Sequence, residues 1–211
     1  TLVENRKGVL GPLMRELILK TYGAPKAWWD DLFRIFIDNV NEKHVAFYFK
    51  MDQPGFEQAA EQLNAAGRVQ EANGDYLMVN DVNFGGAKAN FFVKQDVTQN
   101  MEIDKEGTIT KTLTVTYTNS SPASNCNLEA GKLCLNAPLP NWVRIYIPKG
   151  SQLIEAVGLD KQMETGEELG KTVFQGFLTV NPQSSSKTIY KYKLPFKAKE
   201  VSGELLIQKQ K

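Results

Sequence analysis

A change in hydrophobic period near residue 88 limits the fold of this 211-residue chain more than any other feature. Before it, apolar residues recur every three or four positions, the spacing of one helix face. After it, apolar and polar residues alternate, as in segment 108–117, and this alternation is typical of a strand buried on one face. A helix-patterned first part followed by a sheet-patterned second part predicts the α+β class.

Two helices are predicted in the first part, one ending at Gly23 and one beginning after Pro25. Trp28 and Trp29 are neighbours and therefore lie about 100° apart on a helix, so we expect one of them to be half exposed. Packing of a wide apolar face under a sheet is the favoured interpretation. A sugar-stacking platform is the alternative. A strand at 44–50 and a small-residue helix ending at Gly67 are predicted next.

The second part is predicted to contain short strands at regular spacing, separated by turns such as Asp104-Lys105-Glu106-Gly107. The expected strands are 76–79, 89–94 with its alternation continuing to 98, 108–117, 142–147, 152–157, 171–180, 188–194 and 204–208. This spacing predicts an immunoglobulin-like antiparallel β-sandwich. We therefore expect a helix-rich α/β subdomain over residues 1–86 and a β-sandwich domain over residues 87–211.

The turn predicted between the first two of these strands carries the best candidate binding site. Its polar residues are Asp81, Asn83, Lys88 and Asn90. Asp81-x-Asn83-x-Gly85 imitates the start of a calcium loop, but the twelfth position is Phe92 where a bidentate acid is required, so no metal is predicted. Asp81 and Asn83 either cap the turn, with Lys88 paired to Asp81, or contact a ligand or partner.

The two cysteines, Cys126 and Cys134, are close in the chain and enclose Ala130-Gly131. Such a short loop can bring two Cα atoms to the distance a disulfide requires, about 5.5 Å. Two reduced thiols and half of a metal site are the competing interpretations, and the second is disfavoured because the single histidine, His44, is remote. A disulfide agrees with an extracytoplasmic protein.

Several function classes lack their sequence signatures. One histidine is too few for a two-histidine zinc motif, and Gly-x-Ser-x-Gly, phosphate-binding and dinucleotide-binding loops are absent from the sequence. The acidic pairs, such as Glu167-Glu168, are interpreted as solvated surface. A formal net charge of +1 predicts no nucleic-acid partner, and no apolar run approaches the roughly 20 residues of a membrane span. We predict no catalytic residue and no cofactor.

Several ordered motifs resemble one bacterial family. They are Asp75-Tyr76-Leu77, Asp81-x-Asn83-x-Gly85-Gly86-x-Lys88-x-Asn90, Val143-Arg144-Ile145-Tyr146-Ile147-Pro148-Lys149-Gly150, Gly170-Lys171-Thr172-Val173-Phe174-Gln175-Gly176-Phe177, Tyr192-Lys193-Leu194-Pro195 and Leu206-Ile207-Gln208-Lys209-Gln210. From about His44 onward the chain resembles the proteins grouped as domain of unknown function 4012. The resemblance implies a cell-surface setting, with a single membrane anchor and a large outward-facing region. Since the chain shows no anchor and does not begin with Met, we expect it to be a soluble fragment of a longer protein.

These observations predict a non-catalytic extracytoplasmic module of a cell-envelope protein, serving structure or protein contact. Its expected partner is an envelope protein or a glycan, with membrane attachment only through an anchor outside this fragment. One alternative is a carbohydrate-binding module that uses Trp28, Trp29, Trp142 and Tyr146 as exposed aromatic residues. The other is an enzyme acting on envelope polymers through Asp81 and neighbouring acids.

Overall fold

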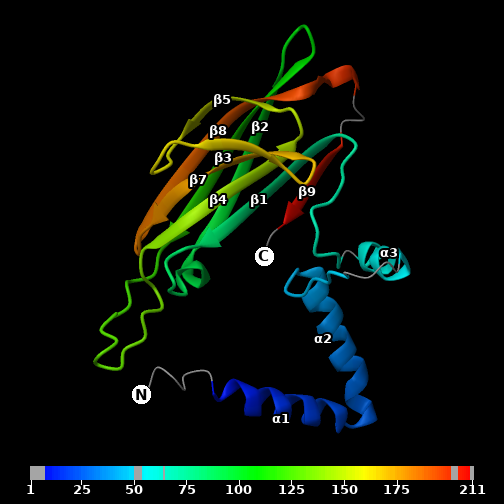
Figure 1. Cartoon of the computed structure of the whole chain (residues 1–211), viewed down its shortest axis with the longest axis vertical. Helices are drawn as coiled ribbons and strands as arrows, with labels where there is room; N and C mark the ends of the chain where they lie inside the picture. The colour runs from blue at the N-terminus through cyan, green and yellow to red at the C-terminus, as the bar shows by residue number, and fades with distance from the viewer. Residues whose placement is uncertain (1–7, 50–53, 64, 201–203, 210–211) are drawn as a thin grey trace. The chain divides into compact units, whose positions relative to one another are not determined.

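The computed structural model describes residues 8–49, 54–63, 65–200 and 204–209 (Figure 1). The chain separates into two compact units, an N-terminal unit that extends to Arg68 and a sandwich unit that begins at Val69. The expected boundary after residue 86 falls inside the sandwich unit, because strand β1 (Asp75–Asn83) is paired within one of its sheets.

The N-terminal unit contains α1 (Leu10–Tyr22), a short 3-10 turn η1 (Lys26–Trp28), α2 (Trp29–Asn41) and α3 (Pro54–Gln62). The first two helices match the prediction, and α1 ends where the amide of Gly23 donates to the carbonyl of Leu19 at 3.0 Å. The strand predicted at 44–50 is wrong: the described part of this segment forms a single bridge, between Phe47 and Ala66. Aromatic packing holds this segment in place of strand pairing. The ring centroid of Phe47 lies 6.2 Å from that of Phe36 and 6.0 Å from that of Phe49.

The sandwich unit contains two sheets whose strand pairs are antiparallel except for β1 with β9. The five-stranded sheet has the order β6 (Glu164–Glu168), β7 (Lys171–Val180), β4 (Leu139–Pro148), β1 and β9 (Leu205–Lys209). The four-stranded sheet has the order β2 (Lys94–Ile103), β3 (Thr108–Asn119), β8 (Ser184–Lys197) and β5 (Gln152–Val157). Two 3-10 turns, η2 (Ala89–Phe92) and η3 (Ala198–Glu200), flank these strands. The predicted α+β class is confirmed at this level.

One hydrophobic core joins the two sheets. Alternate residues of β3, such as Leu113 and Val115, are buried against alternate residues of β4, such as Val143 and Ile145. This alternation produces the period-two sequence pattern, since successive strand side chains point to opposite faces. The segment 120–138 extends from one end of the sandwich, and the β2–β3 hairpin extends from the other (Figure 1).

A buried lysine interrupts the core. The side chain of Lys111, on β3, is 2% exposed, and its ammonium group is ion-paired with Asp75 of β1. It also donates to Oε1 of Gln99, on β2, at 2.9 Å. A buried charge is costly without a partner, so a lysine at this position requires these two interactions.

Candidate functional site

Asp81 lies on β1 and joins the two sheets through hydrogen bonds. Its Oδ1 accepts from the hydroxyl of Tyr117 at 2.6 Å and from Nδ2 of Asn141 at 2.7 Å, and its Oδ2 accepts from Nε2 of Gln95 at 2.5 Å. Burial raises the pKa of Asp81, and the three donors oppose that rise. Tyr117 and Gln95 belong to the four-stranded sheet, and Asn141 to the five-stranded sheet. The carboxylate therefore has a clear structural role between the layers.

Asn83 organises the loop after β1. Its Oδ1 accepts from the amide of Gly85 at 2.7 Å, and its Nδ2 donates to the carbonyl of Ala87 at 2.9 Å and to Oδ1 of Asn90 at 3.1 Å. These bonds fold residues 84–92 into a compact loop ending in η2, so the strand predicted at 89–94 is wrong and β2 begins only at Lys94. The side chain of Lys88 is exposed, while its amide donates to the carbonyl of Leu135 at 3.0 Å.

The outer face of the five-stranded sheet presents an aromatic cluster that consists of Phe84, Trp142 and Phe177. Trp142 and Phe177 are cross-strand partners, with ring centroids 6.4 Å apart and an interplanar angle of 17°. Phe84 meets both rings edge-on, at 6.0 Å and 5.5 Å. Trp142 is half-buried and Phe84 is 59% exposed. Since Asp81 points into the sandwich and Trp142 points out of it, these two predicted candidates do not form one site.

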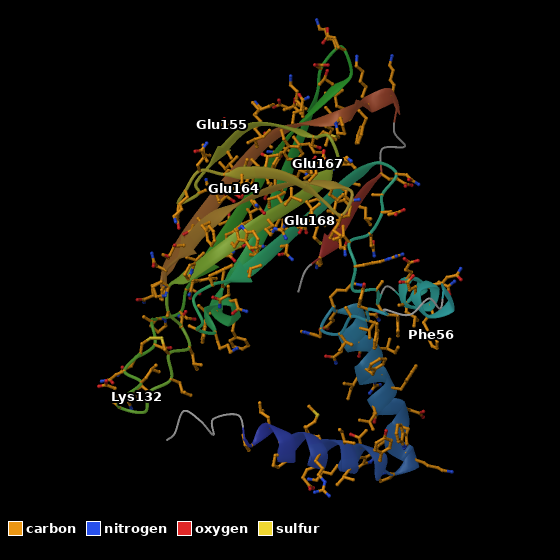
Figure 2. All side chains as sticks on the ribbon, viewed as in Figure 1. Phe56, Lys132, Glu155, Glu164, Glu167 and Glu168 are labelled. Carbon is orange, nitrogen blue, oxygen red and sulfur yellow. A yellow bond between two sulfur atoms is a disulfide. The ribbon has the colours of Figure 1, made fainter. Side chains whose placement is uncertain are left out.

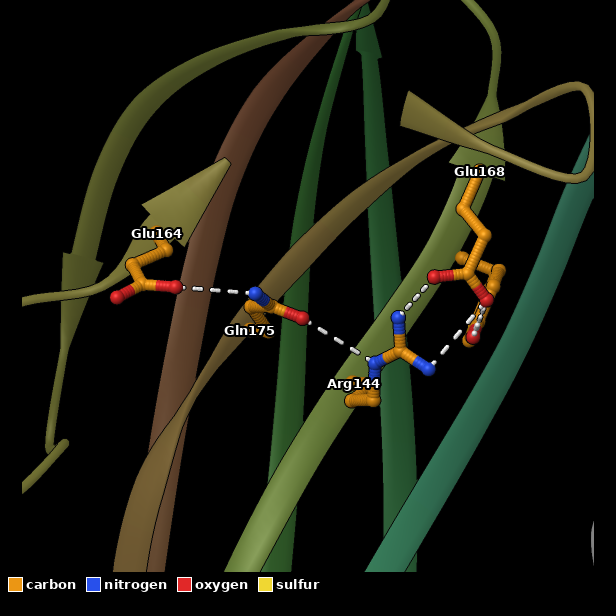
Figure 3. A network of polar contacts seen from close by, with 5 residues as sticks. Arg144, Glu164, Glu168 and Gln175 are labelled. Carbon is orange, nitrogen blue, oxygen red and sulfur yellow. Dashed lines mark hydrogen bonds and ion pairs between the residues drawn. The ribbon is translucent and has the colours of Figure 1, made fainter. Parts of the chain in front are cut away.

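Beside the aromatic cluster lies a polar row that crosses β4, β7 and β6 (Figure 3). Arg144 places its guanidinium 4.7 Å from the ring centre of Trp142. It donates to Oε2 of Glu168 at 2.5 Å and to Oε1 of Gln175 at 3.2 Å. Gln175 in turn donates to Oε2 of Glu164 at 3.0 Å. The row therefore presents carboxylate and amide oxygens beside the aromatic cluster.

The electrostatics of this row favour binding over acid–base chemistry. The Arg144 guanidinium holds the pKa of Glu168 below its usual range, and the hydroxyl of Tyr146, which donates to Glu168 at 3.0 Å, acts in the same direction. A glutamate kept ionised in this way is poorly suited to donate a proton near neutral pH. Tryptophan, tyrosine and arginine, in contrast, are the residue types that dominate binding energy at protein interfaces.

Sequence reasoning included Trp142 among the candidates but missed Phe84, Arg144 and Phe177. Arg144 and Trp142 share a face of β4 because they are two residues apart, and the sequence shows that spacing. Phe177 and Phe84 join them only through strand register and through the loop held by Asn83. The sequence does show an outward aromatic residue in both 142–147 and 171–180, but it does not show that Trp142 pairs with Phe177.

Trp28 and Trp29, the other aromatic candidates, belong to the N-terminal unit. They are 61% and 44% exposed. The structure describes their unit by itself, so it does not bring them together with Trp142.

Cys126 and Cys134 form a disulfide, as predicted. The base of their loop is fastened by Asn136, whose Nδ2 donates to the carbonyl of Pro122 at 2.8 Å and whose Oδ1 accepts from Asn119 at 2.8 Å. Figure 2 shows the same loop with Lys132 at its far end, remote from the labelled glutamates Glu164, Glu167 and Glu168. The disulfide thus braces a projecting loop.

Comparison of the chain with protein-family models and with curated proteins found no match, so the family resemblance stays a prediction. Within the described residues, no helix has both the length and the apolar character needed to cross a bilayer. No group of three or more metal-ligating side chains occurs in that same part of the chain.

Proposed function

We propose that this chain is a non-catalytic, extracytoplasmic protein-interaction module of a bacterial cell-envelope protein related to the family of domain of unknown function 4012. The observation that carries the proposal is the outer face of the five-stranded sheet. There, Trp142 lies half-buried between Phe84, Phe177 and the guanidinium of Arg144. A partly exposed tryptophan with an arginine and flanking rings matches the composition of interface hot spots.

The extracytoplasmic location is supported by the disulfide between Cys126 and Cys134, because such bonds persist in oxidising compartments. The cell-surface setting and attachment through a membrane anchor rest on the family resemblance. Both are parts of the proposal.

The immunoglobulin-like assignment is supported by the order β2-β3-β8-β5, which corresponds to the A-B-E-D order of that fold. In that correspondence β4 takes the position of strand C. The other strands of the five-stranded sheet, which are β1, the β6–β7 hairpin and the parallel strand β9, do not follow the chain order of that fold, in which two strands come after strand E. They widen the sheet that carries the aromatic cluster, which is consistent with a face used for contact.

A glycan is the second candidate partner, and one observation favours it. The rings of Trp142, Phe177 and Phe84 are partly exposed and form an aromatic surface of the kind against which sugar rings pack. The hydrogen-bonding groups of Gln175 and Glu168 lie beside it. The enzyme alternative has less support, since the carboxylate of Asp81 is held by three donors, two of which are buried.

The experiment places a photo-reactive amino acid at Phe84 in the full-length protein, expressed in the bacterium that makes it. The matched control places the same group at Lys193, an exposed residue on the outer face of the four-stranded sheet. Protein adducts at position 84 that are absent at position 193 support the proposal, whereas glycan adducts support the second candidate. Equal adduct patterns at both positions, or none at position 84, refute the assignment of this face.

A further inference from the structure

The two sheets end in four edge strands, and β2 differs from the other three. β6 spans only Glu164–Glu168 and is exposed and acidic, while β9 spans only Leu205–Lys209. β5 has a register shift between Leu153 and Glu155. Short length, charge and bulges are the features by which proteins prevent pairing at sheet edges. β2, by contrast, runs for ten residues and stays in continuous register with β3.

β2 also carries apolar side chains on the core face without cover. Val97, Met101 and Ile103 are paired in register with Val115, Lys111 and Ile109 of β3, which are all buried. The β2 residues themselves are 41%, 57% and 52% exposed. The sandwich is therefore open along this edge, where a further strand would extend the four-stranded sheet and cover these side chains.

The charges on the opposite face of β2 indicate which strand fits. If a second copy of β2 pairs antiparallel about a two-fold axis at Thr98, Lys94 of each copy faces Glu102 of the other. Moving the axis to Gln99 sets Lys94 against Asp104 but also sets Asp96 against Glu102, and moving it to Asn100 sets Asp96 against Asp104. An axis at Val97 pairs Lys94 with Asn100 and provides no charge contact. Among these registers, the one centred on Thr98 alone gives two attractive pairs without a repulsive pair.

We propose that the β2 edge is a self-association surface, on which a second copy of this chain adds its own β2 antiparallel, with Thr98 opposite Thr98. The two four-stranded sheets then form one continuous sheet. The strand edges provide backbone hydrogen bonds, the Lys94–Glu102 pairs set the register, and the apolar core-face side chains of the two copies meet. This surface lies on the other sheet from the aromatic cluster, so self-association leaves that cluster accessible for the proposed partner.

The first test is disulfide trapping of the full chain at three positions on the exposed face of β2. Residues that face each other across antiparallel strands have Cα atoms about 4.5–5.5 Å apart, within the range of a disulfide. Thr98→Cys should therefore give a covalent dimer when treated with oxidised glutathione. Asp96→Cys and Asn100→Cys should each give no covalent dimer when treated alone, because their own copies lie roughly 14 Å apart along the strands. A mixture of these two variants should crosslink, since position 96 faces position 100.

The second test is sedimentation of charge-reversed variants. Lys94→Glu and Glu102→Lys should each weaken self-association roughly tenfold, because two attractive pairs become repulsive, and the double variant should restore it. Lys105→Glu, on the adjacent turn, changes the same charge outside the paired segment and should have no effect. A chain that is monomeric at all concentrations, equal crosslinking at positions 96, 98 and 100, or a double variant without rescue would each overturn the proposal.

Discussion

Replacement of Asp81 tests whether its carboxylate serves structure. In the Asp81→Ala variant the hydroxyl of Tyr117 and Nδ2 of Asn141 lose their shared acceptor, and both residues are buried. A buried donor left without a partner costs about 1–3 kcal/mol, so two cost about 2–6 kcal/mol. Gln95 is exposed and recovers a water partner. Because the variant also no longer buries a carboxylate, we expect a net loss of roughly 2–4 kcal/mol in the free energy of unfolding.

The matched control is Asp81→Asn. Both buried donors bind the same atom, Oδ1, so an asparagine carbonyl at that place keeps both bonds. Its amide group then faces the side chain of Gln95, which can rotate to accept from it. We expect this variant to unfold within about 1 kcal/mol of the parent protein.

Urea denaturation measures the difference. A background of Trp28→Phe and Trp29→Phe leaves Trp142 as the only tryptophan of three, so its fluorescence reports on the sandwich unit. The alanine variant should lower the urea midpoint by about 1–2 M. If the asparagine variant is as unstable as the alanine variant, the negative charge itself is required and the hydrogen-bond argument is wrong. If the alanine variant unfolds like the parent, Asp81 is available for another role.

Three further predictions concern other parts of the sandwich unit. Burial raises the pKa of Tyr76 and Tyr190 to about 12, which favours the neutral phenol in the folded state, so stability should be lost as the pH rises from about 10 to about 12. A phenolate absorbance titration in which all tyrosines ionise near pH 10 would contradict this. Gly85→Ala should cost about 1–3 kcal/mol in thermal unfolding, because a Cβ there lies 2.8 Å from a proline ring, whereas a neutral result would show that the loop adjusts. Thiol labelling of the denatured protein, followed by intact mass, should modify Cys126 and Cys134 only after reduction, and labelling without reductant would refute the disulfide.

The sequence was most informative where local pattern alone determines structure. The alternation of Ile109, Leu113, Val115 and Tyr117 identified β3, because each of these side chains is buried in the core. The short spacing of the cysteines identified the disulfide for a similar reason, since few chain conformations lie between close residues.

Prediction failed where side chains or distant strands decide the structure. The predicted strand 76–79 continues to Asn83, because β4 offers partners for residues as far as that asparagine. The predicted strand 89–94 is a loop because the amide group of Asn83 bonds three groups beyond it. The aromatic cluster could not be predicted from the sequence for another reason. Phe177 contacts Trp142 only in the register of β7 with β4, and that register depends on tertiary pairing.

The buried ion pair of Lys111 has a consequence for how the sheets choose their alignment. A slip of β3 by one residue would turn the lysine to the outer face and leave Asp75 inside without its cation, an arrangement far more costly than the loss of an apolar contact. Core residues such as Leu113 and Val115 also oppose a slip of one residue, which would expose them, but they discriminate poorly between alignments two residues apart, since either fills much the same space. The lysine, together with Asp75 and Gln99, therefore penalises misaligned β1, β2 and β3 during folding, and it does so at the edge where the sandwich is open.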